Sequence, residues 1–274
     1  MDLELWSVRP LWLTVLAALW GAAAGLLVPR AAYRFAVEPD EAWRTRCPDG
    51  HVLTGAAGGW LGLARCLDCA QDLRGLRDLR TSWSGPGDAP TAYRYGPGTP
   101  LVALATAGAC TGLALATGAR PELAVWLLLA PLGVLLAVVD FRVQRLPDIL
   151  TLPLAGLALV LLGVMALVPE HAGQWPAALF GSLVLGGAYF LLFLVNPNGM
   201  GFGDVKLALG IGAVLGWYGW GTVVLGTFAG FLFGGLYGLG LVLMRRAGRK
   251  TSIPFGPFLI VGAYVGLLIG AYAA

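Results

Sequence analysis

Charge is scarce in this sequence. Only 12% of the 274 residues are charged and 58% are apolar, whereas a soluble domain carries about 25% charged residues. The shortage argues against a soluble enzyme with a charged surface, a disordered chain or an acidic tail. The formal net charge of +3 gives no indication of a nucleic-acid partner, and none is expected. What remains is a protein whose main solvent is lipid, and the 41 glycines are typical of membrane helices.

About half of the charge lies in one segment. Residues Arg30–Gly98 hold 9 of the 18 basic and 8 of the 15 acidic residues. The sequence therefore predicts an N-terminal transmembrane anchor over residues 1–29, a cytoplasmic insert over 30–98 and a transmembrane domain over 99–274. The insert is too short to build a large core. Its tail, Ser82–Gly98, is rich in Gly and Pro and has the composition of a linker.

The apolar runs predict an all-α polytopic membrane protein. A spanning helix needs roughly 20 mainly apolar residues. The candidates are Leu11–Val28, Pro100–Thr117, Leu123–Val139, Ile149–Val168, Trp175–Val195, Val205–Trp217, Thr222–Met244 and Phe255–Ala273. We expect eight spans, or seven if the short sixth candidate does not cross the bilayer. The first run is interpreted as a retained anchor because acidic residues precede it, although a cleaved signal peptide is the alternative.

Basic residues predict how the helices are oriented. With eight spans, one side of the membrane receives the insert and most basic loop residues, namely Arg142, Arg145, Lys206, Arg245, Arg246, Arg249 and Lys250. The other side receives only Arg9 and Arg120. Since Arg and Lys near helix ends favour the cytoplasm, we expect the insert to be cytoplasmic and both termini to lie outside.

Three carboxylates stand at helix ends on the predicted cytoplasmic side. Asp140 ends a long apolar run, Asp148 precedes the next one, and Asp204 begins a later one. A carboxylate at the rim of the bilayer core is costly unless it is solvated or paired, so it indicates function. The alternative is that these are interfacial loop residues beside basic neighbours. Two aspartates at matched depth, one of them within Gly-x-Gly-Asp, favour the functional interpretation.

A pair of neighbouring carboxylates has its own chemistry. The two cannot both ionise cheaply, so one keeps a proton while the other acts as a base. Such a pair can activate water to attack a peptide carbonyl and then protonate the leaving amine. Helix dipoles suggest that Asp204 starts as the base and Asp140 as the acid, with Lys206 strengthening the bias. Gly201 and Gly203 would let an extended substrate backbone approach.

These residues resemble a known family, the bacterial type IV prepilin leader peptidases. Val139-Asp140 together with Arg145–Leu150 resembles the family's first aspartate motif. Gly199–Leu207 resembles the second motif and Ile253–Leu259 the C-terminal signature. The three segments occur in the family's order, and the resemblance covers roughly Pro100 to Ala274.

The resemblance implies an intramembrane aspartic protease of the Gly-x-Gly-Asp type. Its catalytic pair would be Asp140 and Asp204, whereas Asp148 matches a supporting position that can be Asp or Asn. The substrate would be a prepilin or pseudopilin whose leader is removed at the cytoplasmic side of the inner membrane. Proteolysis would need no cofactor.

Many members of this family also methylate the new N-terminus with S-adenosylmethionine. That activity is linked to N-terminal motifs from which this chain departs. The usual Gly-Ser-Phe-Leu-Asn is replaced by Gly25–Pro29, which has no Asn, and a glutamate is replaced by Ala103. Proteolysis is therefore the expected activity, and methyl transfer is not supported by these motifs.

Three of the four cysteines lie in the insert. The resemblance implies two Cys-x-x-Cys pairs that bind zinc, but here only Cys66 and Cys69 form such a pair. Cys47 is followed by His51 in place of a second pair. Three Cys and one His can still form a tetrahedral structural zinc site, and the alternative is a decayed site with free thiols. Cys110 lies within a span, where we expect it to serve packing.

A rival interpretation belongs to another functional class. The aspartates could line an ion path in a transporter, or the chain could be a scaffold for pilus or secretion assembly. The absence of acidic residues from the middle of the spans argues against an ion path, because proton relays usually need carboxylates deep in the bilayer.

Overall fold

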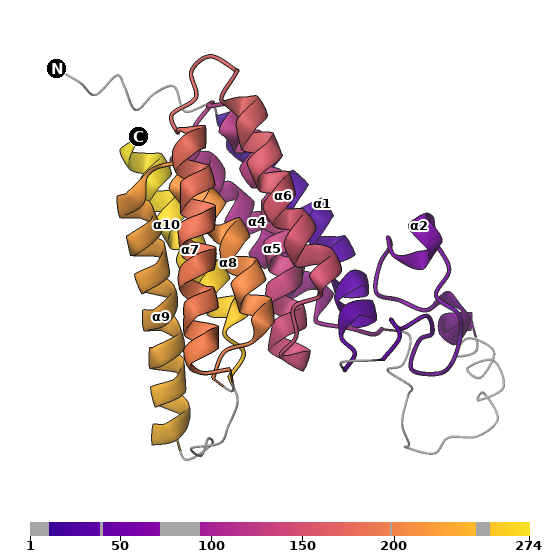
Figure 1. Cartoon of the computed structure of the whole chain (residues 1–274). Coiled ribbons are helices and arrows are strands. Elements are labelled where there is room, and N and C mark those ends of the chain that lie inside the picture. The colour runs from indigo at the N-terminus through magenta and orange to yellow at the C-terminus, as the bar shows by residue number, and fades with distance from the viewer. Residues whose placement is uncertain (1–10, 39–40, 72–93, 198, 245–252) are drawn as a thin grey trace, which may run out of the picture.

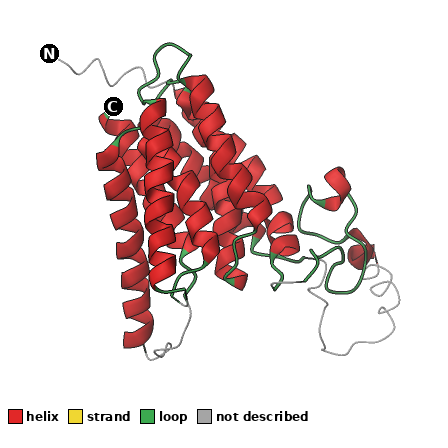
Figure 2. Cartoon of the chain, viewed as in Figure 1, coloured by secondary structure: helices red, strands yellow, loops and turns green. Residues whose placement is uncertain are grey.

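The chain folds as a bundle of helices with a small irregular insert at one end (Figure 1). The computed structural model describes residues 11–38, 41–71, 94–197, 199–244 and 253–274. Within these ranges the regular structure is helical, and β-pairing is limited to isolated bridges (Figure 2). The bundle helices are α1 (Leu11–Phe35), α4 (Thr99–Thr117), α5 (Glu122–Val143), α6 (Asp148–Met165), α7 (Trp175–Val195), α8 (Phe202–Gly216), α9 (Trp220–Leu243) and α10 (Gly256–Ala273).

Seven of these helices are long and apolar enough to cross a membrane, the exception being α8. This confirms the prediction of an all-α polytopic membrane protein. The predicted sixth span, Val205–Trp217, forms α8, a helix of 15 residues. Most of its residues are buried, and it packs against α6, α7, α9 and α10. Because protein surrounds α8, its length need not match the bilayer.

Helix α1 is longer than the apolar run predicts. It continues past Val28 through Pro29 and ends at Phe35. Arg30, Tyr33 and Phe35 in this extension are buried against the insert and the neighbouring helices. The predicted boundary between anchor and insert, after residue 29, therefore falls inside a continuous helix.

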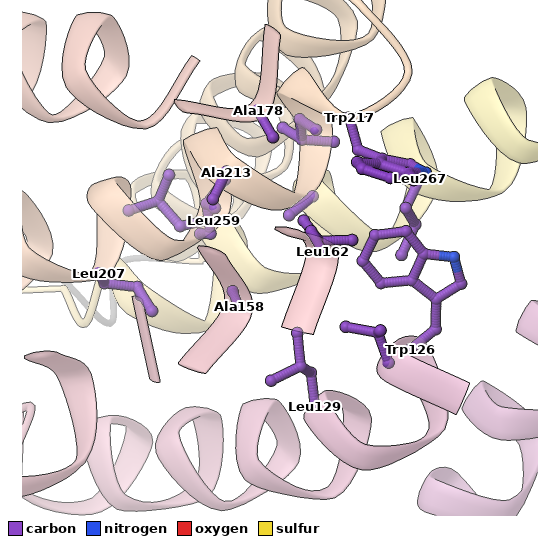
Figure 3. Packing of buried hydrophobic residues seen from close by; sticks show 14 of the residues in the cluster. Trp126, Leu129, Ala158, Leu162, Ala178, Leu207, Ala213, Trp217, Leu259 and Leu267 are labelled. Atoms are coloured by element: carbon purple, nitrogen blue, oxygen red, sulfur yellow. The ribbon is translucent and has the colours of Figure 1, made fainter. Parts of the chain in front are cut away.

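Apolar side chains and close glycine contacts hold the bundle together. The core is built around fully buried residues such as Trp126, Leu162 and Leu207 (Figure 3). At the contact of α7 and α8, a Cβ added to Gly181 would lie 2.5 Å from the carbonyl oxygen of Gly212. Lipid is as apolar as these side chains, so the hydrophobic effect does not drive membrane helices together. They associate through close packing, which small residues allow.

The insert and the three aspartates share one end of the molecule. The chain leaves α1 at this end, and the C-terminus of α10 lies at the opposite end (Figure 1). Contacts join the insert to the bundle, since Arg145 donates to the carbonyl oxygen of Glu38 at 2.7 Å and lies over the ring of Trp43. Several predictions concern residues outside the described ranges, namely Arg9, most of the linker Ser82–Gly98, and the basic cluster Arg245, Arg246, Arg249 and Lys250.

Candidate active site

Asp140 is held by the beginning of another helix. It lies in the last turn of α5 and is only 4% exposed. Its Oδ2 accepts a hydrogen bond of 3.0 Å from the backbone N–H of Gly256, the first residue of α10. A Cβ at residue 256 would lie 2.8 Å from the same oxygen, so the approach requires glycine. The start of α10 thereby supplies both a donor and a favourable dipole to this carboxylate.

Asp204 is held by the beginning of its own helix. It lies in the first turn of α8, and its carboxylate accepts the backbone N–H of Gly201, the N-cap residue. The backbone N–H of Asp204 in turn donates to the carbonyl oxygen of Gly201 at 3.0 Å. The contact from the Asp204 carboxylate back to the N-cap N–H is one half of a capping box; glycine has no side chain to supply the other half. Like Asp140, Asp204 is buried, at 8% exposure.

The fold brings Asp140 and Asp204 together from helices that do not pack on each other. The backbones of α5 and α8 do not lie next to each other in the described parts of the chain, whereas the backbones of α6 and α10 each lie against both. The carboxylates are close enough for the charge of Asp140 to act on Asp204. Two buried carboxylates whose charges repel each other favour a state in which they hold one proton between them. The pair is thus arranged to supply one acid and one base.

An apolar cavity of about 540 Å³ extends into the membrane region from this end of the bundle. Its walls include Val138 and Phe141 of α5, Leu207 of α8, and Pro257 of α10. These residues neighbour Asp140, Asp204 and Gly256 in the sequence. The cavity therefore lies along the helices that carry the site, and its apolar lining suits an apolar ligand.

Asp148 and Lys206 form a separate pair. The Lys206 Nζ lies 2.6 Å from Asp148 Oδ2, and the ammonium also lies over the ring of Phe202. The Asp148 side chain is 64% exposed, unlike the two buried aspartates. The ion pair connects the beginning of α6 to the beginning of α8. The sequence argument assigns Lys206 to biasing the catalytic pair, but its ion pair in the described residues is with Asp148.

The two predicted glycines lie in different surroundings. A Cβ at Gly203 would lie 2.9 Å from the Leu146 Cβ, so this glycine permits close packing of the loop between α5 and α6. At Gly201 the nearest atom to an added Cβ would be Asp204 Oδ2, at 3.4 Å, an ordinary contact. Only Gly201 therefore leaves room beside the carboxylate for a substrate backbone.

Sequence reasoning did not single out two residues of this site. Gly256 lies within the C-terminal signature. The sequence feature that could have identified it is a glycine before a proline at the start of a span. Tyr189 is a fully buried phenol on α7 that interacts electrostatically with Asp204. Its ring stacks on Phe231, and its hydroxyl has no hydrogen-bond partner within the described chain. In the sequence, Tyr189 is marked only as a single tyrosine within the apolar span Trp175–Val195.

The insert gathers the four predicted metal ligands. The ligand atoms of Cys47, His51, Cys66 and Cys69 all lie within 4.8 Å of one another. The Cys47 and Cys69 Sγ atoms are 3.6 Å apart, and His51 Nδ1 lies 3.2 Å from Cys69 Sγ and 3.7 Å from Cys47 Sγ. A tetrahedral ion with Zn–S bonds of about 2.3 Å separates its ligand atoms by roughly 3.5–3.8 Å. The four residues thus form a group that could hold a metal ion.

Burial and a neighbouring carboxylate both act on the thiol of Cys69 in this cluster. Burial raises the pKa of the Cys69 thiol, and its hydrogen bond to Asp49 raises it further. A thiol in such surroundings gives up its proton when a cation takes the proton's place. All three cysteines are buried, so the cluster is also protected from solvent.

Comparison with known proteins agrees with the motifs. Residues 127–239, which include both buried aspartates, match the model of the type IV leader peptidase family. A protein named prepilin leader peptidase/N-methyltransferase from Dichelobacter nodosus is 31% identical over 76% of this chain and 71% of its own length. Proteins of the same name from Stutzerimonas stutzeri and Aeromonas hydrophila are 28% and 35% identical. The matches cover 97% and 66% of this chain.

These relatives are matched over different shares of their own length. The chain spans 94% of the Stutzerimonas stutzeri protein but only 60% of the Aeromonas hydrophila protein. No solved structure matches the chain. The relatives do not favour the rival interpretation as a transporter or scaffold, and the apolar helices make the protein a multi-pass membrane protein. The chain belongs to the type IV prepilin leader peptidase family, as its three motifs predict.

Proposed function

We propose that this protein is an aspartic endopeptidase that removes the leader peptide of type IV prepilin-like proteins. One observation carries the proposal: Asp140 and Asp204 are buried together at one end of the bundle, and each accepts a backbone N–H from the beginning of a helix. The relatives of this chain are named for the same activity. The substrate would be a prepilin or pseudopilin in the bilayer.

The reaction needs water and two carboxyl groups. The ionised aspartate accepts a proton from water as the water oxygen attacks the scissile carbonyl carbon. The protonated aspartate donates its proton to the carbonyl oxygen, which gives a neutral tetrahedral diol. In the second step the leaving nitrogen takes the proton that the base had accepted, the C–N bond breaks, and one hydroxyl returns its proton to the other aspartate. No other protein group is required, so proteolysis needs no cofactor.

The division of labour between the aspartates differs from the simple dipole argument. That argument considers only the helix that carries each residue, so the end of α5 would favour a neutral Asp140. The N–H of Gly256 adds a donor from the start of α10, and this contact favours the ionised form of Asp140. Either carboxyl can therefore begin as the base, and the pair is best treated as one titrating unit.

The proposed site faces the cytoplasm of a bacterial inner membrane. Arg142, Arg145 and Lys206 lie in the loops and helix ends on the aspartate side, as does the insert. Arg and Lys near helix ends favour that side of the membrane. The apolar cavity beside Val138, Leu207 and Pro257 would receive apolar side chains of the substrate next to the scissile bond.

We propose a structural zinc ion for the insert. Cys47, His51, Cys66 and Cys69 supply four ligands, which closes a tetrahedral shell and leaves no position for a reacting water. The ion would fix the fold of the insert and take no part in proteolysis. Metal analysis of the purified protein tests this: one zinc per chain is expected, and metal-free protein whose thiols all react would refute it.

Methyl transfer is not part of the proposed activity. The relatives are named for it, but the residues linked to it differ in this chain. Ala103 is buried where α4 meets α1, and a Cβ on Gly25 would lie 2.7 Å from its Cα. The two helices pack closely here, with the Thr106 hydroxyl also within 2.9 Å of that added Cβ. Ala103 has no charged group, so it cannot act as the glutamate that the resemblance links to methyl transfer.

A cleavage assay tests the proposal. Membranes with the wild-type protein should shorten a prepilin, whereas Asp140→Ala and Asp204→Ala should each leave it uncut. Glu170→Gln serves as the control, because it removes an exposed carboxylate from a loop at the other end of the bundle and should cut normally. Normal cleavage by either aspartate variant would exclude the pair as catalytic, and an inactive wild type would favour a scaffold.

A further inference from the structure

Two arginines are buried where α1 meets the insert. Arg30 and Arg34 lie one helical turn apart, and each is only 6% exposed. Arg30 donates through Nη2 to the carbonyl oxygen of Thr54, and Arg34 donates through Nη1 to that of Gly58 at 2.9 Å. The ring of Trp60 covers the Arg34 guanidinium at 3.9 Å. Both side chains are therefore fixed beneath the loop of residues 54–62.

The charges of these arginines are not neutralised within the described residues. No carboxylate there forms an ion pair with either guanidinium. Like charges at positions i and i+4 of a helix repel each other, and the two guanidinium groups do so here. Burying a cation without a counter-charge is strongly unfavourable. Backbone carbonyls satisfy some of the N–H groups but carry no net charge.

Three buried donors at this place have no acceptor within the described chain. They are the Nε atoms of Arg30 and Arg34 and the hydroxyl of Tyr95. Tyr95 is 5% exposed and interacts electrostatically with both arginines. Burial raises the pKa of Tyr95, so its hydroxyl keeps the proton and remains a donor. A buried donor without an acceptor costs about 1–3 kcal/mol, and here three of them accompany two unneutralised charges.

The loop over the arginines has a shape that only glycine allows. A Cβ at Gly62 would lie 2.4 Å from Arg30 Nη1, and one at Gly55 would lie 3.2 Å from the same atom. Both glycines have positive φ, 145° and 142° respectively. The backbone therefore closes directly onto the guanidinium of Arg30. Fastening the loop explains the two carbonyl contacts. It does not explain why two cations without a counter-charge are buried within electrostatic reach of a buried phenol.

We propose that Arg30, Arg34 and Tyr95 form a binding site for a phosphate group. Its charge would neutralise the guanidinium pair, and its oxygens would accept from the three donors. A phosphate fits better than a carboxylate because its oxygens point in tetrahedral directions and can meet donors from three side chains. The site stands at the end of the apolar run of α1, near the predicted membrane surface. The phosphate therefore belongs either to a lipid headgroup or to a soluble molecule.

Thermal unfolding of the full-length protein in detergent tests the site. Inorganic phosphate, compared with chloride at equal ionic strength, should raise the Tm of the wild type, because a ligand that binds only the folded state stabilises it. Arg30→Gln and Arg34→Gln should each raise the phosphate concentration needed by about tenfold or more. Arg44→Gln is the matched control, since Arg44 is an exposed arginine of the insert that lies over Tyr33, and it should keep the full shift.

Tyr95→Phe covers the case in which an arginine variant fails to fold. It removes only the hydroxyl, and the half-maximal phosphate concentration should rise several-fold. Equal phosphate shifts in the wild type, both arginine variants and Tyr95→Phe would overturn the proposal, as would the loss of the shift in Arg44→Gln.

Vesicles distinguish the two sources of phosphate. The wild type is placed in phosphatidylcholine alone and in an equimolar mixture with phosphatidylglycerol. If the anionic lipid raises the Tm and abolishes the effect of added phosphate, and Arg30→Gln loses both responses, the ligand is a lipid headgroup. If the phosphate shift is the same in both vesicles, the ligand is soluble. A wild type that responds to neither phosphate nor the anionic lipid would refute the site.

Discussion

The bundle and the insert handle buried charge in different ways. In the bundle, Asp140 and Asp204 are each held by a backbone N–H at the start of a helix, so the fold supplies their partners. Where α1 meets the insert, Arg30 and Arg34 are buried without a counter-charge among the described residues. The four candidate metal ligands of the insert also lie close together, within 4.8 Å of one another. Backbone donors therefore contact the buried charges of the bundle, whereas we propose that ligands balance the buried charges at the insert.

Size explains the difference. The bundle buries a large apolar core that runs through most of its helices. The insert has a small buried cluster, made of Tyr33, Cys47, Leu53, Ala64, Cys66, Cys69 and Tyr95. Three of these are cysteines that also belong to the metal-ligand group. A segment with so little apolar area usually needs a metal or another crosslink to stay folded. We therefore expect substitutions in the bundle to affect catalysis and substitutions in the insert to affect stability.

The largest expected effect comes from neutralising one member of the aspartate pair. Asp140→Asn and Asp204→Asn should each reduce prepilin cleavage by at least roughly 10²–10⁴-fold, because the acid or the base is lost. Each should also raise the Tm, since the substitution removes a buried charge beside a second carboxylate. Cleavage kinetics and thermal unfolding of the same preparations measure both effects. A variant that lost activity and stability together would indicate a structural role instead.

Gly256→Ala should have the second largest effect. The added methyl would lie 2.8 Å from Asp140 Oδ2 and would push the carboxylate from its donor. Misplacing a catalytic group by about 1 Å can cost around 100-fold in rate, so we expect a loss of that order without unfolding. Gly235→Ala on α9 is the matched control, because nothing lies within 4 Å of the added atom. Equal activity of the two variants would show that the start of α10 does not position Asp140.

The fold was largely predictable because apolar runs and charge are strong signals in membrane proteins. The helices from α4 to α10 follow the predicted spans closely, and the insert joins the predicted end. The end of α1 was wrong by seven residues, Val28 against Phe35. Arg30 and Arg34 are buried by a loop that comes later in the chain, at residues 54–62. Periodicity and hydropathy describe only local sequence, so they could not predict that the helix continues through these arginines.

The site was predictable only where a residue type is out of place. Asp140 and Asp204 are conspicuous because the apolar part of the chain contains few carboxylates. Gly256 could not be recognised in the same way, since glycine is common here and its role depends on the distance to a residue 116 positions earlier. The ion pair between Asp148 and Lys206 also depends on how α6 and α8 pack, which no local pattern reveals.

Removing a metal ligand should separate the two regions. Cys66→Ala should eliminate bound zinc and make the insert sensitive to limited proteolysis. Prepilin cleavage should fall by less than about tenfold, because the aspartate pair lies in the bundle. Metal content and proteolysis patterns are the measurements. Cys110→Ala removes a buried thiol within α4 instead and should retain one zinc per chain. Complete loss of cleavage in Cys66→Ala would mean that the site does depend on the insert.

Tyr189→Phe tests the buried phenol that lies near the aspartates. Its hydroxyl lacks a partner within the described chain, so removing it should raise the Tm by eliminating an unsatisfied polar group. We also expect cleavage to slow by about tenfold, because the hydroxyl is a donor for the bound peptide or for Asp204. The pH dependence of kcat/KM should shift as well. A higher Tm with unchanged kinetics would assign the hydroxyl to packing alone.

The smallest expected effect concerns Asp148. Asp148→Asn makes the same chemical change as Asp140→Asn, but at a side chain that is 64% exposed and forms its ion pair in the described parts of the chain with Lys206. An exposed ion pair is worth about 0–1 kcal/mol and weakens with salt. Cleavage should therefore stay within about threefold of the wild type, and the small loss of Tm should vanish at high ionic strength. An Asp148 variant as inactive as Asp140→Asn would place the catalytic carboxylates at the membrane surface and would remove burial as the property that distinguishes the site.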